Sequence, residues 1–566
     1  MKSIQAQLSK IISKAFDVNV SEKEFTIPPK MEMGDFAFPC FELAKELKKS
    51  PVEIATILAE KVKNEELIVK AQVAGPYVNF YINEKSLIEY LEKEVLKNKK
   101  FGQGEKQNKK YVVEFACPNT HKAFHIGHLR NIITGESVSR ILDNAGYDVV
   151  RANYQGDVGM HIAKALWGIN HLKEEYQEVK KASVDDKVKF LGKAYAVGAQ
   201  AYETDESAKK EIHENNEKIY SKAADIEDVY SETRKWSLEY FDNIYKRIDT
   251  FFDRFYFESE IFSRGKNLVE EYLEKGVFKK SEGAIIFEGE KFGLHSRVFI
   301  NSKGLPTYEA KDLALAELQF KEYNPEKIIH VVGKEQIEYF KVIFCALEQI
   351  LPATKDKEYH LAYGWVALKH GKMSSRTGKV VLGEWLLDEI ETKISGIVEK
   401  SEVADKETTK QRVALAAVKY AMLKVGIKVD MSFDIDESVN ISGDSGPYLL
   451  YIGARINSIL KKVSLEKKVK QKDEETSALH LTERKVILSL LKFPGITNKA
   501  AVELDPSQIA KYLFDLAQDF NNFYTECSVL NAEGQTKKIR VELITAVNKV
   551  MAKGLNLLGI EAVEEM

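Results

Sequence analysis

The sequence predicts a multidomain α/β protein: a parallel-sheet domain with a helical insertion, an N-terminal α+β domain and a C-terminal all-α helical bundle. Three observations predict this fold class. The length of 566 residues is enough for about three or four domains. Residues 111–154 have the pattern of strand, helix and strand, which is one βαβ unit of a buried parallel sheet. Beyond residue 387, apolar side chains recur almost wholly at helical spacing.

The first 105 residues predict the α+β domain. Apolar side chains over residues 4–16 fall on one helical stripe. Ser50 and Pro51 are suited to an N-cap and a first helical position, so a second helix should begin there. Residues 72–83 alternate between apolar and polar side chains, which predicts one strand. The polar, glycine-containing run at 97–110 predicts a linker.

The βαβ unit starts with residues 111–117, which are mostly apolar and β-branched, and Pro118 should end this strand. A helical pattern runs from Leu129 and should stop at Gly146, and residues 147–154 give the second strand. At the carboxyl end of the first strand and the amino end of the helix, free backbone N–H groups and the helix dipole favour a phosphate. We therefore expect the chemistry at this edge of the sheet.

Two histidines, His125 and His128, lie at this edge. Imidazoles can hydrogen-bond phosphate oxygens and, if protonated, offset charge that develops at phosphorus, while Gly127 lets a nucleotide approach the backbone. Ordinary surface histidines are one alternative. A zinc site that adds His121 is another, but the spacing mixes two helical faces and the four cysteines include no C-x-x-C pair. Neither alternative explains Gly127, so no zinc or other metal ligand set is expected.

The segment around these histidines resembles a known family. His125-Ile-Gly-His128 after a strand resembles the signature of class I aminoacyl-tRNA synthetases. The preceding Glu114-Phe-Ala-Cys-Pro-Asn-Thr-His-Lys and the following Leu129-Arg130-Asn131 resemble arginyl-tRNA synthetases in particular. The resemblance covers essentially the full length of the chain.

This resemblance implies three domains. They are an additional α+β domain that contacts the tRNA corner at 1–105, a Rossmann-like catalytic domain at 106–386 with a helical connective insertion at about 170–280, and a helical anticodon-binding domain at 387–566. The charge-rich residues 171–235 should be mostly helical and solvated. Residues 283–287 and 296–300 have strand composition and are expected to re-enter the catalytic domain.

A candidate amino-acid pocket comes from the second half of the catalytic domain. Tyr308 and Asp312 are four residues apart, so both point to one place if this segment is helical. Asp312 could pair with a cation of the protein itself, or with a substrate guanidinium on which the ring of Tyr308 stacks. The resemblance implies the second role, in an arginine pocket formed by Asn119, Tyr308, Asp312 and Gln336.

A glycine-bracketed basic loop, Lys369-His-Gly-Lys-Met-Ser-Ser-Arg-Thr-Gly, follows a strand expected at 359–368. A mobile loop of this kind can fold over a triphosphate and stabilise charge on the departing diphosphate, although a plain surface turn is the alternative. The loop resembles the KMSKS loop of class I synthetases, but Ser375 replaces its second lysine. Some arginyl enzymes with this gap place a lysine just before the histidine signature, and Lys122 occupies that place.

The resemblance thus implies two sets of site residues around ATP. The catalytic residues would be His125, His128, Lys122 and Lys372. The ATP-binding residues would be Pro118, His125, Gly127, His128, Gly333, Lys372, Met373, Ser374, Ser375 and Arg376.

The C-terminal part predicts a helical bundle. Residues 413–423 are apolar around much of a helix, Gly446 begins another helix, and apolar side chains at 509–524 form a stripe that reads as bundle core. Residues 461–475 predict a charged connection.

Bulk properties exclude several classes of protein. No apolar run approaches the ~20 residues that cross a bilayer, so no membrane partner is expected and the protein should be cytoplasmic. The net charge of −3 argues against indiscriminate nucleic-acid binding, so RNA contacts must come from local surfaces. The absence of a P-loop and of G-x-G-x-x-G disfavours kinases and dehydrogenases.

The resemblance implies an arginine–tRNA ligase, which activates L-arginine with ATP and Mg²⁺ to arginyl-adenylate, releases diphosphate, and transfers arginine to the 3′-terminal adenosine of tRNA(Arg). Its expected partners are tRNA(Arg), L-arginine and ATP, and it should be a monomer. Two alternative functions belong to other classes of protein. A nucleotidyltransferase shares the histidine signature but does not need the N- and C-terminal domains. A catalytically dead tRNA-binding paralogue should have lost His125, His128 or Asp312, and all three are present.

Overall fold

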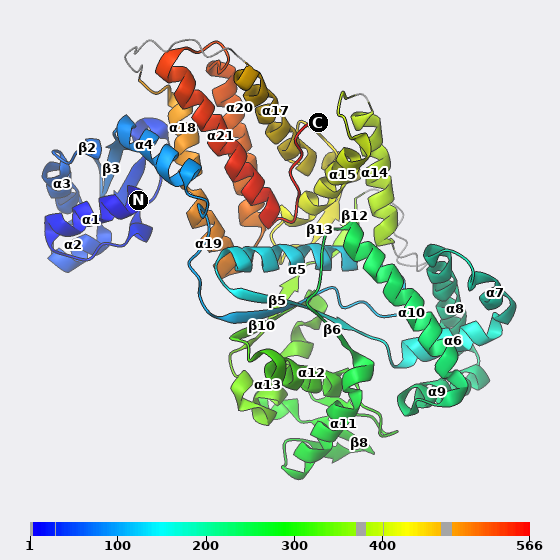
Figure 1. Cartoon of the computed structure of the whole chain (residues 1–566). Coiled ribbons are helices and arrows are strands. Elements are labelled where there is room, and N and C mark those ends of the chain that lie inside the picture. Colours follow the sequence, from blue (N-terminus) through cyan, green and yellow to red (C-terminus); the bar gives the residue numbers. More distant parts are fainter. Residues whose placement is uncertain (1–3, 29, 370–380, 400, 466–477) are drawn as a thin grey trace.

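The structure is a computed structural model, and it describes residues 4–28, 30–369, 381–399, 401–465 and 478–566. Figure 1 shows an N-terminal domain at one side, a central sheet, a helical insertion at the opposite side and a C-terminal group of helices. Within the described ranges, none of the helices has the length and apolar character that crossing a membrane requires.

The N-terminal domain packs helices on a three-stranded antiparallel sheet. Its elements are α1 (Ile4–Phe16), α2 (Phe41–Leu47), α3 (Pro51–Val62) and α4 (Glu84–Tyr90), with strands in the order β1 (Phe36–Pro39), β3 (Tyr77–Ile82) and β2 (Ile68–Ala74). As predicted, Ser50 caps α3, and its hydroxyl accepts the Glu53 N–H at 3.2 Å. The single strand predicted at 72–83 is wrong. A hairpin stands there, because Gly75 takes a φ of +60° and Pro76 has no N–H to continue the ladder.

The central sheet has five parallel strands in the order β11-β10-β4-β5-β6. They are β4 (Lys110–Glu114), β5 (Asp148–Gln155), β6 (Arg254–Phe257), β10 (Lys327–Gly333) and β11 (Glu358–Tyr363). The predicted βαβ unit is confirmed, with α5 (Ile126–Asn144) between β4 and β5. The first strand ends at Glu114 instead of Cys117, because Ala116 and Cys117 take positive φ values of 73° and 46°.

The sheet lies between two layers of helices (Figure 1). One face is covered by α11 (Glu258–Glu274), α12 (Tyr308–Tyr323) and α13 (Ile337–Ile350). On the other face α5 separates the sheet from the C-terminal helices. Strand residues that alternate along the chain, such as Val112, Ala152, Tyr256 and Ile328, form the core under α11 to α13.

The insertion is helical, as predicted, and has a core of its own. It consists of α6 (Met160–His171), α7 (Lys173–Val179), α8 (Val184–Thr204), α9 (Glu206–Ser221) and α10 (Ala224–Arg247). The chain returns to the parallel sheet at β6, earlier than predicted. The predicted re-entry strands β8 (Ala284–Phe287) and β9 (Arg297–Ile300) do exist, but they form a separate antiparallel sheet with β7 (Lys279–Ser281). The turn between β7 and β8 is tight because Glu282 and Gly283 both have positive φ values.

The strand predicted at 359–368 is divided. Its second part, β12 (Val366–Leu368), leaves the sheet and pairs in parallel with β13 (Met431–Phe433). The break falls at Gly364, whose N–H donates to the Ile427 carbonyl at 2.9 Å and where a Cβ would lie 2.3 Å from the Val429 carbonyl oxygen. Only glycine permits this close approach of two backbones.

The C-terminal part is helical, as predicted, except for the short strand β13, which pairs with β12 of the catalytic part. Its helices are α14 (Gly383–Val398), α15 (Lys406–Leu423), α16 (Ile435–Ser438), α17 (Gly446–Leu465), α18 (Leu481–Leu491), α19 (Phe493–Glu503), α20 (Ser507–Glu526) and α21 (Gly534–Leu557). The predicted core stripe of α20 is confirmed by its buried Ile509, Leu513, Leu516 and Phe520. The charged connection predicted from residue 461 begins as helix, since α17 continues to Leu465. Its residues 466–475 lie outside the described ranges.

Candidate active site

The two signature histidines form the start of α5. His125 is the N-cap, and its Nδ1 accepts the Gly127 N–H at 3.1 Å. The Nδ1 of His128 accepts the N–H of His125, also at 3.1 Å. The two rings stack with centroids 3.7 Å apart. Because both Nδ1 atoms are acceptors, a neutral imidazole at either position carries its proton on Nε2.

These histidines are neutral at physiological pH. Burial, with smaller contributions from the charges of His125 and Lys122, lowers the pKa of His128 to about 3. Burial and Lys122 also lower the pKa of His125. Of the two modes that the sequence allowed, this environment favours neutral hydrogen-bond donation through Nε2–H over a protonated imidazole.

The third histidine of the segment has a structural position. The Nε2 of His121 lies 2.8 Å from the hydroxyl of Thr233, and its Nδ1 lies 3.1 Å from the hydroxyl of Thr120. It is buried and does not join the other two rings. In the part of the chain that is described, no group of three or more His, Cys, Asp or Glu side chains is arranged to hold a metal ion.

The start of α5 is bound to the chain segment before α14. The Ile126 N–H donates to the Val381 carbonyl and the Gly383 N–H donates to the Phe124 carbonyl, both at 3.0 Å. A Cβ at Gly383 would lie 2.7 Å from the ring of Phe124. The site residues predicted in the basic loop, Lys372, Met373, Ser374, Ser375 and Arg376, lie outside the described residues.

Lys122 lies beside the histidine pair. Its ammonium group stands 5.5 Å from the ring centroid of Tyr195 on α8. Burial and the nearby Lys164 lower its pKa. Among the described residues no carboxylate lies within ion-pair distance of Lys122, so its charge remains available to an anionic ligand.

The loop after β4 places Pro118 and Asn119 against the end of β5. The Gly156 N–H donates to the carbonyl of buried Pro118 at 3.2 Å, and the Asn119 backbone pairs with that of Gly156. A Cβ on Gly156 would lie 2.1 Å from Oδ1 of Asn119. Gly156 therefore fixes the space for a predicted site residue. In the sequence, the turn Gln155-Gly156-Asp157 at the end of a strand is the feature that could have indicated a role for Gly156.

The predicted helix at Tyr308 is confirmed as α12, and Tyr308 is its first residue. The side chain is 52% exposed. Its ring already makes a cation–π contact within the protein, since the Lys311 ammonium lies 4.3 Å from the ring centroid. Lys311 is buried and pairs with buried Glu258 at 2.7 Å. The sequence did not predict this ion pair.

Asp312 faces the sheet from α12. Its Oδ2 accepts the hydroxyl of Tyr339 at 2.6 Å, and it forms no ion pair with any of the described residues. Burial, together with the negative charge of Glu114, raises its pKa to about 7, against the opposing effects of the Tyr339 hydrogen bond and the positive charge of His330. The first alternative from the sequence, an ion pair of Asp312 with a cation of the protein itself, is therefore not formed by the described residues, although the positive charge of His330 across the cavity favours the ionised carboxyl.

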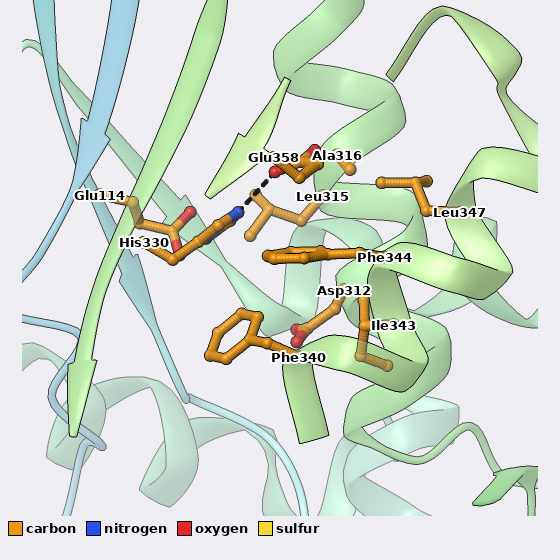
Figure 2. Close-up of a pocket in the computed structure, with 10 residues that line it drawn as sticks. All are labelled: Glu114, Asp312, Leu315, Ala316, His330, Phe340, Ile343, Phe344, Leu347 and Glu358. Atoms are coloured by element: carbon orange, nitrogen blue, oxygen red, sulfur yellow. Dashed lines mark hydrogen bonds and ion pairs between the residues drawn. The ribbon is translucent and has the colours of Figure 1, made fainter. Parts of the chain in front are cut away.

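A small cavity lies between the sheet and the helices α12 and α13. Figure 2 shows Asp312 and Phe340 on the helix side, opposite Glu114 and His330 on the strands. Its other lining residues are Leu315, Ala316, Ile343, Phe344, Leu347 and Glu358. Of the four residues predicted for the arginine pocket, only Asp312 lines this cavity.

Gly333 and Gln336, the remaining predicted residues of this region, lie in the connection between β10 and α13. Gly333 ends β10, and Gln336 is the N-cap of α13, the helix that also carries Phe340.

Sequence reasoning missed a charged triad on the strands. His330 lies between Glu114, 3.0 Å from Nδ1, and Glu358, 2.7 Å from Nε2. Both carboxylates raise the pKa of His330, against the effect of burial. Gln319 donates its amide N–H to the other oxygen of Glu114 at 2.7 Å. Glu114 was visible as a charged residue inside an apolar strand, but its partners come from other strands and from α12.

Three family models match the chain. The description "tRNA synthetases class I (R), catalytic domain" matches residues 91–435, which is more than half of the chain. "DALR anticodon binding domain" matches residues 449–566, and "Arginyl tRNA synthetase N terminal domain" matches residues 2–82.

The chain is also similar to named proteins along nearly its whole length. It is 35% identical to an arginine–tRNA ligase of Treponema denticola over 557 residues, which covers 95% of this chain and 94% of that relative. It is 34% identical to an arginine–tRNA ligase of Borreliella afzelii, with 99% and 98% covered. The solved Thermus thermophilus arginyl-tRNA synthetase superposes with a TM-score of 0.79 at 27% identity, and all of both chains is covered. The Plasmodium falciparum enzyme has a TM-score of 0.77 at 22% identity, which indicates a shared fold.

Proposed function

The chain belongs to the arginyl-tRNA synthetase family, and from that premise we propose how its residues divide the reaction. It is an arginine–tRNA ligase, which activates L-arginine with ATP and transfers arginine to tRNA(Arg). In the first step the arginine carboxylate attacks the α-phosphorus of ATP, diphosphate leaves, and arginyl-adenylate forms. In the second step a hydroxyl of the terminal ribose of tRNA, by class analogy the 2′-hydroxyl, takes the arginyl group and AMP leaves.

We propose that His125 and His128 donate hydrogen bonds from Nε2 to phosphate oxygens of ATP. Their Nδ1 atoms are already engaged by backbone N–H groups, which fixes the rings before the substrate arrives. A preorganised donor costs no reorganisation when charge develops in the transition state. Lys122 and Lys372 would add positive charge on the diphosphate side, and Pro118, Gly127 and Gly333 would border the nucleotide.

Mg²⁺ would enter as part of the ATP substrate. The described residues offer no cluster of side chains that could hold a resident metal ion. Mg²⁺ keeps several waters and commonly binds through substrate phosphates. The proposed role of the protein is thus to position MgATP and arginine, and no covalent enzyme intermediate is needed.

We propose that Asp312 receives the arginine guanidinium, and one observation carries this proposal. Asp312 is a carboxylate in a desolvated cavity, bonded to the Tyr339 hydroxyl and not to any described cation. An unpaired buried charge is costly, so this position suits a cationic ligand. Asn119, Tyr308 and Gln336 would then contact the rest of the amino acid.

The remaining proposals concern the whole molecule. We propose that residues 1–105 contact the tRNA corner, that 106–386 form the catalytic domain, and that 387–566 read the anticodon. We also propose a monomer that works in the cytoplasm.

Amino-acid-dependent exchange of diphosphate into ATP, measured with each of the twenty amino acids and with and without total tRNA, tests the proposed function. Of the twenty amino acids, only arginine should support exchange. A nucleotidyltransferase would show no dependence on an amino acid, and a dead paralogue would show no exchange at all. Exchange with an amino acid other than arginine would contradict the arginine pocket proposed around Asp312.

A further inference from the structure

The hydroxyl of Tyr154 is a buried polar atom that has no hydrogen-bond partner among the described residues. Buried polar groups are nearly always paired, so an orphan of this kind needs an explanation. Tyr154 lies near the carboxyl end of β5, where its register partner on β6 is Tyr256. The hydroxyl of Tyr256 is also enclosed, but it donates to Glu322 at 2.7 Å.

The sheet register places Tyr154 on the same face of the sheet as the cavity described above, although Tyr154 is not one of the residues that line it. Glu114 on β4 pairs with Ala152 on β5, so these two side chains lie on the same face. Side chains alternate along a strand, so Tyr154, two residues after Ala152, shares that face and lies nearer the carboxyl edge. Tyr154 also packs against the core under α11 to α13. Asp312 points to this face from α12 (Figure 2).

The charges around Tyr154 show which neighbour lacks a partner. Burial raises the pKa of its hydroxyl, and the negative charges of Glu258, Asp312 and Glu114 raise it further. Glu258 is paired with Lys311 at 2.7 Å, and Glu114 with His330 at 3.0 Å. Asp312 forms no ion pair with a described residue, and only the more distant charge of His330 opposes its own. An orphan hydroxyl and a carboxylate without an ion pair among the described residues therefore lie on the same face of the sheet.

We infer that the Tyr154 hydroxyl is a specificity-determining acceptor for the guanidinium group of arginine, beside Asp312. A guanidinium has five N–H donors in a fixed plane and no acceptor, so one carboxylate cannot satisfy it. Asp312 supplies the charge, and the lone pairs of Tyr154 supply a neutral acceptor for a further N–H. This inference rests on the proposed role of Asp312.

The test is Tyr154→Phe, which removes only the hydroxyl, with Tyr256→Phe as the matched control. The KM for arginine in ATP–diphosphate exchange should rise about 10- to 100-fold in Tyr154→Phe, the scale of one hydrogen bond to a charged group. The KM for ATP and kcat at saturating arginine should change by less than about threefold. Tyr256→Phe should leave the KM for arginine unchanged.

Thermal unfolding without ligands separates this role from a structural one. Tyr154→Phe should have an unchanged or higher Tm, because it removes an unpaired buried hydroxyl, whereas Tyr256→Phe should have a lower Tm because it breaks a hydrogen bond. The rise in Tm that arginine produces should shrink in Tyr154→Phe.

Asp312→Asn, measured in parallel, distinguishes a failure of the proposed guanidinium site at Asp312 from a failure of the inference about Tyr154. If Asp312→Asn raises the KM for arginine and Tyr154→Phe does not, the inference about Tyr154 is overturned and the proposed pocket stands. If neither variant raises it, the proposed pocket fails as well. A lower ligand-free Tm of Tyr154→Phe, with equal losses for arginine and ATP, would show a structural tyrosine and overturn the inference.

Discussion

The ring of His128 stacks on the ring of His125 with centroids 3.7 Å apart, and the N–H of His125 donates to the Nδ1 of His128. The second histidine of the signature is thus held by the backbone of the first. Both rings are left with Nε2 as the atom that can donate to a ligand.

This geometry predicts the behaviour of His128 variants. His128→Ala should slow adenylate formation by on the order of 10²-fold, the usual scale for one preorganised donor, with little change in arginine affinity. His128→Gln, whose amide nitrogen can reach the place of Nε2, should retain more activity than His128→Asn. The measurement is single-turnover adenylate formation at saturating arginine. Parallel losses in arginine binding and in rate would instead identify a structural histidine.

Asp312 gives a prediction with a pH dependence. Asp312→Asn should raise the KM for arginine by a factor that corresponds to roughly 2–4 kcal/mol, because it removes the charge opposite the guanidinium and nearly keeps the shape. The pKa of Asp312 is raised to about 7, so the carboxyl gains a proton as pH falls below that value. Arginine binding favours the ionised form, and the KM for arginine should therefore rise as pH falls, by up to about tenfold per pH unit.

The variant Asp312→Asn also serves as the control for the predicted pH dependence of the KM for arginine. In Asp312→Asn the KM for arginine should be nearly flat across the same pH range, since the titrating group is gone. If the KM for arginine of Asp312→Asn stayed within about twofold of the wild-type value at neutral pH, Asp312 would not be the residue that binds the guanidinium.

Lys122 and position 375 should share one role. Lys122→Ala should lower kcat for activation by about 10²-fold, because Lys122 would supply the charge that the second lysine of the KMSKS loop supplies elsewhere. Adding Ser375→Lys should recover a good part of this loss, whereas Ser375→Lys alone should change little. The rates are measured with saturating arginine and tRNA. A double variant no faster than Lys122→Ala would show that the two positions act independently.

Gly156 should affect arginine use because it leaves room for the side chain of Asn119. Gly156→Ala would place a Cβ 2.1 Å from Oδ1 of Asn119, so this side chain must move. We expect kcat/KM for arginine to fall by about 10-fold or more, since small displacements of positioning groups are costly. Gly192→Ala is the matched control, because nothing lies within 4 Å of a Cβ there. Equal activity of the two variants would contradict a role of Asn119 in arginine binding.

His121 should contribute to acid instability. Burial lowers its pKa from 6.5 to about 3 in the folded protein. As pH falls from 6.5 towards 3 the unfolded chain binds a proton that the folded chain does not, so the free energy of unfolding decreases. The decrease should be about 1.4 kcal/mol per pH unit from this group.

His121→Gln removes this titration. Urea unfolding at about pH 7 and about pH 5 should therefore show a smaller loss of stability in the variant than in the wild type. The same loss in both proteins would mean that His121 is not buried in its neutral form.

Local signals predicted elements well, and their failures have local causes. The helix at Ser50 was predicted correctly because an N-cap and a first-turn proline act within a few residues. The helix predicted from Leu129 starts three residues earlier, because His125 serves as an N-cap although histidine is not among the preferred residue types. The strand predicted at 72–83 ignored the turn at Gly75, which splits it into a hairpin.

By itself, the sequence determined the βαβ unit, the three-domain order and the family, because periodicity, caps and a contiguous motif are properties of neighbouring residues. Tertiary structure alone decided the charge states in the site and the partners of each buried group. His330 and Glu114 are 216 residues apart in the chain and 3.0 Å apart in the fold. Desolvation and hydrogen bonding depend on which distant segments meet, so the neutral His128, the bond from Tyr339 to Asp312 and the hydroxyl of Tyr154 without a partner among the described residues could not be predicted from spacing.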